Sequence, residues 1–172
     1  RERLAASKKE LESLKARLEA RKSQQSKRSD DLKALTRVVG EHLLGSPGHA
    51  RFLPGEEYRP FGVAKGGEAY QVLEVLLGDI VCLIDSATSM ESHHPGFLVH
   101  DCPREADMSE ILYRNFFLTA AEAAEQLACA TGTPIQYIVT TTSAPPGELQ
   151  SGRHVVLELE PGVDDKLLFR RE

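Results

Sequence analysis

Residues 4–39 read LAASKKELESLKARLEARKSQQSKRSDDLKALTRVV, and apolar residues recur along them at heptad spacing. Steps of seven residues run through Leu4, Leu11, Leu18, Gln25, Leu32 and Val39, and Leu14 and Leu35 each follow three residues after such a position. This spacing is typical of the a and d positions of a coiled-coil helix. Gly45-Ser46-Pro47-Gly48 supplies poor helix formers, so the helix is expected to end there. We therefore predict a helical arm over residues 1–45.

The predicted arm needs something to pack against. A single amphipathic helix is marginal in water, so we expect its apolar seam to meet a helix from outside this chain. Arg21, Gln25 and Arg28 stand in the middle of the seam, where the pairing should be weak or interrupted. Packing of the helix on the chain's own lobe is the alternative.

Charge divides the chain into two parts. Residues 1–45 carry 12 Lys and Arg against 7 Asp and Glu, whereas the remaining residues carry 9 against 19. A basic arm could contact a DNA backbone, but its charges are mixed in sign and a long helix needs a solvated face. We favour the solvated face over DNA contact on these residues alone.

The location of the protein is predicted from what the sequence lacks. It has no run of about 18 apolar residues, and its N-terminus is too charged for a signal peptide. The sequence therefore predicts a soluble, cytoplasmic protein with no membrane partner. Cys82, Cys102 and Cys129 form no CxxC pair and are expected to be reduced thiols.

Residues 46–172 show the alternation of helices and strands that is typical of an α/β lobe. A turn-rich loop or short hairpin is expected between Ala50 and Val63, followed by a helix over residues 69–84 with one buried face. Residues 97–100 and 135–139 are predicted to be buried strands, separated by a helix from Glu110 to about Ala130 with Ser109 as its cap. Residues 154–159 and 167–169 are predicted as further strands, the first at a sheet edge.

Three features of this lobe could bind a ligand together. A Gly66-Gly67 turn opens a helix, where backbone amides can donate to phosphate oxygens. One buried strand ends at Asp101, and the other ends in the hydroxyl residues 140–142. Because ligands gather at the carboxyl ends of parallel strands, these side chains are expected to lie side by side. A carboxylate at that edge suits Mg²⁺, which prefers one or two carboxylates plus phosphate oxygens.

These motifs resemble those of the C-terminal lobe of ABC-type ATPase heads of the SMC/RecN/RecF-like group, in which a coiled coil enters the lobe. Ala64-Lys65-Gly66-Gly67-Glu68 is similar to the signature motif, and residues 97–101 are similar to Walker B. Residues 105–107 resemble the D-loop region, and residues 138–141 resemble the strand before the switch histidine. The resemblance covers nearly the whole chain. No Walker A sequence, GxxxxGK[ST], occurs in it.

The resemblance implies a function and a set of partners. ATP and Mg²⁺ would be bound between two heads that form a homodimer, each completed by an N-terminal lobe that carries Walker A. An antiparallel coiled-coil helix would pair with the arm, and DNA would be a partner in maintenance, repair or defence. Asp101 would hold Mg²⁺ through its water shell, and Lys65, Gly66, Gly67 and Glu68 would contact nucleotide in trans. Asp107 would lie in the D-loop.

Three positions depart from the family pattern. Lys65 replaces the signature serine, Cys102 takes the place of the catalytic glutamate, and Thr141 stands at the switch position. Glu105 is the nearest carboxylate that could act as the base, and a solvated loop charge is the alternative for it. The departures predict slow or altered hydrolysis.

Other functions stay open on the sequence. A zinc site could use His93, His94, His100, Asp101 and Cys102, although their spacing matches no closed motif and His100 is more often a packed core residue. A cysteine hydrolase would use Cys102 as nucleophile, but Pro103 argues that the strand stops before it. The main alternative is a non-catalytic coiled-coil dimerisation module with a degenerate nucleotide-binding head.

Overall fold

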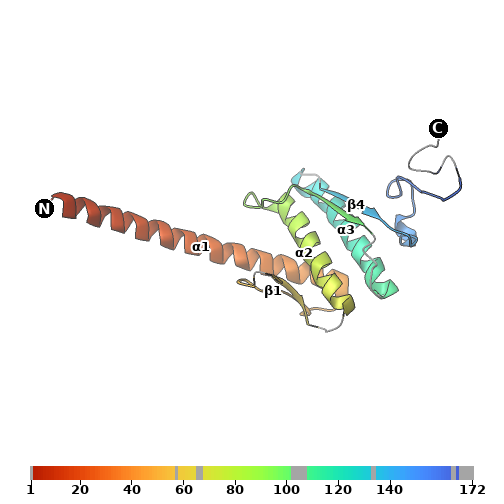
Figure 1. The fold of residues 1–172 in the computed structure, drawn as a ribbon, viewed down its shortest axis with the longest axis horizontal. Coiled ribbons are helices and arrows are strands. Elements are labelled where there is room, and N and C mark those ends of the chain that lie inside the picture. Colours follow the sequence, from red (N-terminus) through yellow and green to blue (C-terminus); the bar gives the residue numbers. More distant parts are fainter. Residues whose placement is uncertain are drawn as a thin grey trace.

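The computed structural model describes residues 2–56, 58–64, 68–101, 108–132, 135–163 and 166. Its described residues form helices and two small sheets, with a long helix projecting from a lobe (Figure 1). The elements are α1 (Glu2–Leu44), β1 (Ala50–Phe52), β2 (Phe61–Val63), α2 (Glu68–Thr88), β3 (Phe97–Asp101), α3 (Glu110–Thr131), β4 (Gln136–Thr140) and the short 3₁₀ helix η1 (Gly147–Leu149).

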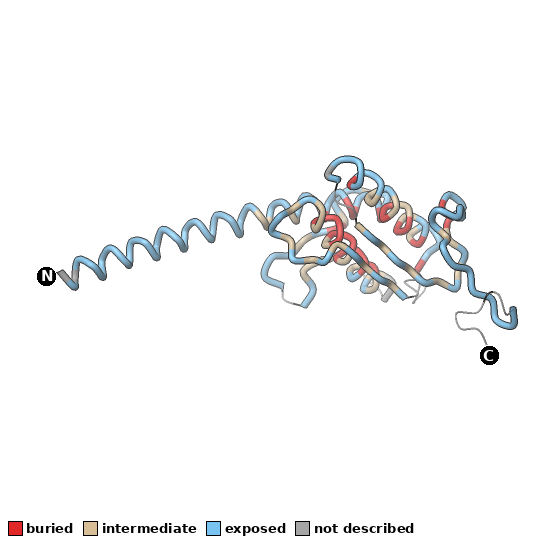
Figure 2. Tube along the Cα trace, turned by 90° about the horizontal axis from the view of Figure 1, so that it is seen from above, coloured by how far each residue is buried: buried red, intermediate tan, exposed pale blue. Residues whose placement is uncertain are grey.

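The first part of α1 extends away from the lobe. Residues 5–27 are exposed along the whole projecting segment (Figure 2). The seam residues Leu11, Leu14 and Leu18 are 50%, 52% and 54% exposed, so about half of each leucine surface is open to a partner. The predicted long helix is confirmed, and the helix expected to pair with it stays a prediction.

The last part of α1 belongs to the lobe itself. Thr36, Val39 and Leu43 are almost fully buried, and this end of α1 packs on α2, α3 and β1. The Asn115 side chain of α3 donates a hydrogen bond to the Leu43 carbonyl at the end of α1. The prediction that the seam faces an external helix as far as Val39 is therefore wrong at this end, because the lobe supplies the apolar surface that covers it.

Two glycines let the β1–β2 hairpin approach the helices closely. A Cβ atom at Gly40 of α1 would lie 2.0 Å from the Ala50 Cβ, and one at Gly78 of α2 would lie 2.6 Å from the Phe61 ring. Contacts this short do not occur between real atoms, so any larger residue would push the hairpin away. The short hairpin expected in this region is confirmed, and it lies against both helices.

Strands β3 and β4 pair in parallel, with α3 connecting them. Ser109 caps α3 by accepting a hydrogen bond from the Leu112 amide, as predicted. The face of the sheet with His100 and Tyr137 is turned toward the helices and is partly buried. The other face carries Phe97, Val99 and Ile138, which are 52%, 55% and 44% exposed. Parallel sheets are normally covered on both faces, so this apolar face is unusual.

The predicted strand at residues 154–159 is wrong. These residues form no strand, and Val156, Leu157 and Leu159 are exposed. Alternating apolar residues make a strand only where a neighbouring strand is available for pairing, and no such pairing is formed by this segment in the described structure. The possible strand at residues 167–169 lies outside the described residues.

Candidate functional site

The carboxyl ends of β3 and β4 bring two predicted residues together. Asp101 is the register partner of Thr140, and the Thr140 hydroxyl donates a hydrogen bond to the Asp101 carboxylate. Both side chains are exposed at the edge of the sheet. The expectation that these strand ends lie side by side is confirmed, and the hydrogen bond orients a carboxylate that faces solvent.

Thr141 follows directly and is held by its own hydrogen bonds. Its hydroxyl lies 2.9 Å from the Tyr113 hydroxyl of α3 and 3.1 Å from the Ser143 amide nitrogen, which donates to it. These contacts fix the backbone where it leaves β4. Thr141 therefore directly follows the Asp101–Thr140 pair, and its hydroxyl is engaged within the lobe. Its expected switch role stays a prediction.

A polar cluster lies behind this edge, between the sheet and the helices. The His100 Nε2 is 3.0 Å from Asp79 Oδ2 of α2, and its Nδ1 is 3.1 Å from the Tyr137 hydroxyl of β4. The imidazole stacks on the Phe116 ring of α3 at a centroid distance of 6.1 Å. The His100 side chain is only 14% exposed. The expectation of a packed histidine is confirmed, whereas its partners were not predicted.

Burial controls the protonation of Tyr137 in this cluster. Loss of hydration raises the pKa of the Tyr137 phenol well above its ordinary value, and Tyr113 and the Asp79 carboxylate raise it further. The phenol therefore keeps its proton throughout the neutral range. It acts in the cluster as a neutral hydrogen-bond partner of His100.

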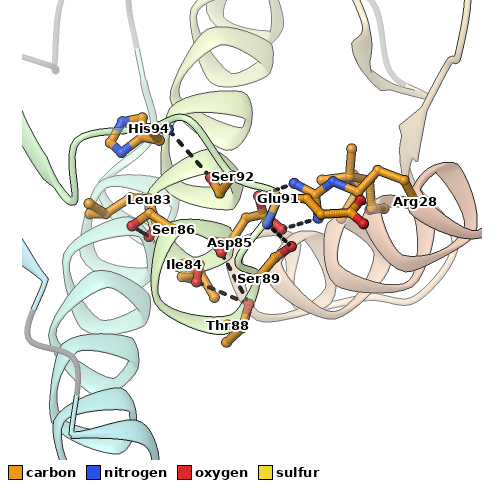
Figure 3. Close-up of polar contacts among 12 residues, drawn as sticks. Arg28, Leu83, Ile84, Asp85, Ser86, Thr88, Ser89, Glu91, Ser92 and His94 are labelled. Carbon is orange, nitrogen blue, oxygen red and sulfur yellow. Dashed lines mark hydrogen bonds and ion pairs between the residues drawn. The ribbon is translucent and has the colours of Figure 1, made fainter. Parts of the chain in front are cut away.

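A second polar contact joins the arm to α2. Arg28 reaches from α1 to Asp85, as Figure 3 shows, and its Nη1 lies 2.6 Å from Asp85 Oδ1. Close by, the Gln24 amide donates to the Glu91 carboxylate over 2.7 Å. Helix α2 is thus bonded to the arm near its C-terminal end and to β3 through Asp79.

Several predicted site residues lie outside the part of the chain that is described. Lys65, Gly66, Gly67, Glu105 and Asp107 are among them, as is Cys102, on which the cysteine-hydrolase hypothesis depends. Glu68 is the first residue of α2, so the predicted glycine turn directly precedes this helix. Of the predicted site, the structure therefore describes the start of α2, the end of β3 and the end of β4.

The described edge offers oxygen ligands that suit magnesium. Asp101 provides an exposed carboxylate, and Thr140 provides a hydroxyl beside it. Mg²⁺ in phosphoryl-transfer sites takes one or two carboxylates and completes its shell with water and phosphate oxygens. The residues present fit such an ion. The described residues give no support to a zinc site, because among them no three His, Cys, Asp or Glu side chains come together in a possible metal site.

No protein-family model matches this chain, and no curated protein or solved structure matches it either. None of the helices in the described part of the chain is both long enough and apolar enough to cross a bilayer.

Proposed function

We propose that this chain is the C-terminal lobe of an SMC/RecN-like ABC-type ATPase head, which binds and hydrolyses ATP between two heads. The observation that carries the proposal is the pair of parallel strands that end side by side in Asp101 and Thr140. A carboxylate and a hydroxyl at the carboxyl edge of a parallel sheet support a Mg²⁺-nucleotide site there, because ligands gather at this edge and Mg²⁺ prefers oxygen ligands. The order of the signature-like turn, α2 and β3 along the chain is consistent with the same function.

The uncovered sheet face supports completion by another lobe. A parallel sheet of two five-residue strands, with Phe97, Val99 and Ile138 exposed on one face, lacks the second layer that such sheets normally have. A lobe that carries Walker A and further strands would extend this sheet and cover its apolar face. We call the chain joined to such a lobe the complete head.

Each residue of the predicted site has a role in this proposal. Asp101 would hold Mg²⁺ through its water shell, and the bound ion would supply positive charge against the phosphates. Glu68, the first residue of α2, and the three residues that precede it in the sequence would contact the γ-phosphate of nucleotide held by the opposing head, with Lys65 supplying charge. Glu105 acts as the base in place of a glutamate at Cys102, and Asp107 lies in the D-loop.

The arm suggests which partners the chain would bind. The exposed leucines of the projecting part of α1 suit an antiparallel coiled-coil helix, and two complete heads would associate as a homodimer around ATP. DNA would then be the substrate that the arms help to hold, in a cytoplasmic maintenance, repair or defence process. The basic charge of the arm is compatible with this partner.

The experiment concerns the glycine turn. In the complete head, Gly67→Leu should abolish ATP-dependent association of heads, because a side chain would keep the backbone from the phosphate. ATP binding by the single head should stay within about threefold of wild type, about 0.7 kcal/mol. Gly152→Leu is the control, since a Cβ at Gly152 meets no atom within 4 Å. Loss of ATP binding by the single Gly67→Leu head would show that the turn acts in cis, against the proposal.

A non-catalytic dimerisation module is the second candidate function. The half-exposed seam leucines of α1 favour it, because they provide a dimerisation surface without any nucleotide. Isothermal titration of the complete head with Mg²⁺-ATP separates the two functions. Arm-dependent dimerisation without nucleotide binding supports the module and contradicts the ATPase.

A further inference from the structure

We propose that His100 is a positioning residue that couples α2 to the carboxyl end of β3, and so couples the N-terminal end of α2 at Glu68 to Asp101. The inference rests on the proposed function, since that function places nucleotide contacts at both ends of the coupling. It assigns a role to a histidine that the family resemblance leaves unused.

The His100 ring is held by three other elements of the lobe. Asp79 of α2 bonds to Nε2 at 3.0 Å, and the Tyr137 hydroxyl of β4 bonds to Nδ1 at 3.1 Å. Phe116 of α3 stacks on one side of the ring, and Tyr137 meets it edge-on with a centroid distance of 5.5 Å. Both ring nitrogens are therefore engaged, and the ring orientation is fixed by contacts on α2, α3 and β4.

Directional bonds make this cluster more specific than apolar packing. An apolar side chain at residue 100 could still pack on Phe116, but it would let α2 slide along the sheet without losing a bond. The hydrogen bond that the His100 Nε2–H donates to the Asp79 carboxylate holds only one relative position of the two elements. Asp79 is 40% exposed, so water can solvate its carboxylate when the bond is broken and the helix can occupy another position.

The bond lies between the two predicted nucleotide contacts. Asp79 is about 16 Å along the axis of α2 from Glu68, at about 1.5 Å per helical residue, and the two residues belong to one continuous helix. On the other side of the bond, His100 directly precedes Asp101 in β3. A displacement of the start of α2 by nucleotide on the opposing head would therefore reach Asp101 through Asp79 and His100.

The test measures kcat and KM for ATP in the complete head. His100→Phe keeps a ring against Phe116 and removes both hydrogen bonds, and Asp79→Leu removes the partner on α2. Each should lower kcat at least about tenfold while KM changes less than about twofold, because Asp101 acts on turnover and the Walker A lobe supplies most ground-state binding. The double variant should be no slower than the slower single variant, because both remove one coupling.

Two further variants separate positioning from simple loss of stability. His100→Gln restores a side-chain amide that can donate to Asp79, and it should bring kcat back to within about threefold of wild type. Val81→Ala truncates a fully buried residue of α2 that takes no part in the bond. It should lower the free energy of unfolding and leave kcat unchanged at temperatures well below unfolding.

The outcomes distinguish this inference from the proposed function. An active wild-type head in which His100→Phe turns over normally overturns the inference and leaves the function standing. A wild-type head that hydrolyses no ATP overturns the function, and amide hydrogen exchange then tests the coupling. Asp79→Leu should raise exchange at residues 98–101 at least about tenfold above that in Val81→Ala. Equal exchange in the two variants overturns the coupling itself.

Discussion

Arg28 of the arm helix forms an ion pair with Asp85 of α2, and the Asp85 side chain is only 8% exposed. The hydrogen bond to Asp85 raises the pKa of the Arg28 guanidinium, and desolvation by burial opposes this rise only in part, so the guanidinium stays charged. Arg28 interrupts the heptad seam at the point where α1 leaves solvent and enters the lobe. The residue that weakens the seam for an external partner is thus the residue that joins the arm to α2.

Removing only the Arg28 member of this ion pair should destabilise the lobe. Arg28→Met leaves the Asp85 carboxylate buried without its counter-charge and should lower the free energy of unfolding by about 2 to 3 kcal/mol. Arg28→Met with Asp85→Leu should recover most of the loss, because no buried charge remains. Urea denaturation measures both, with Arg21→Met on the exposed arm as control. A loss no larger than that of the control would show that the pair contributes nothing.

The hairpin contact at Gly40 predicts that alanine at this position destabilises the protein, although alanine usually stabilises a helix relative to glycine. Glycine to alanine inside an exposed helix normally stabilises it by about 0.5 to 1 kcal/mol. In this chain Gly40→Ala would place a methyl group 2.0 Å from the Ala50 Cβ, so the hairpin must move. We expect a loss of about 1 to 3 kcal/mol in thermal or urea unfolding. A more stable Gly40→Ala protein would mean that β1 does not lie against α1 in solution.

The raised pKa of Tyr137 predicts a loss of stability at alkaline pH. The folded state keeps the phenol proton above the unfolded pKa of about 10, where the unfolded state releases it. The stabilisation is therefore complete below about pH 10 and is lost progressively as the pH rises above it. Tyr137→Phe should remove this part of the slope in urea unfolding between pH 8 and 11. Parallel pH dependence of the two proteins above pH 10 would contradict the burial of the phenol.

The two described cysteines should differ in reactivity. Burial raises the pKa of the Cys82 thiol, with the Asp79 and Asp85 carboxylates adding to the effect, whereas Cys129 is exposed. In a Cys102→Ser background at pH 8, iodoacetamide should alkylate Cys129 at least about tenfold faster than Cys82, because the reactive thiolate is scarce and shielded at Cys82. Peptide mass spectrometry gives both rates. Equal rates would mean that α2 opens readily.

Local patterns in the sequence predicted most of the elements. The heptads predicted α1, and apolar runs next to turn residues predicted β3 and β4. The side-by-side placement of Asp101 and Thr140 followed from the geometry of parallel strands. The helix and the strands depend on neighbouring residues along the chain, and the order strand, helix, strand then brings the two strand ends to one edge, which is why a single sequence is enough to predict them.

Long-range contacts could not be predicted in the same way. The seam near Val39 has the same spacing whether it meets an external helix or the chain's own α2 and α3. The alternation at residues 154–159 does not say whether a strand is available for pairing. The sequence gives only a weak indication of the bond between Asp79 and His100. Asp79 is an acidic residue on a mostly apolar helix and His100 is a histidine in an apolar strand, but nothing in the sequence shows that they contact each other.

Steady-state ATP hydrolysis by the complete head tests the central claim most directly. The account predicts turnover in wild type, strong loss in Asp101→Asn, and a rate lowered at least about tenfold in Glu105→Gln, a barrier change of about 1.4 kcal/mol. Glu122→Gln, at an exposed position of α3, is the control and should match wild type. A wild-type rate in Asp101→Asn would contradict the claim that the carboxyl end of β3 is the nucleotide site.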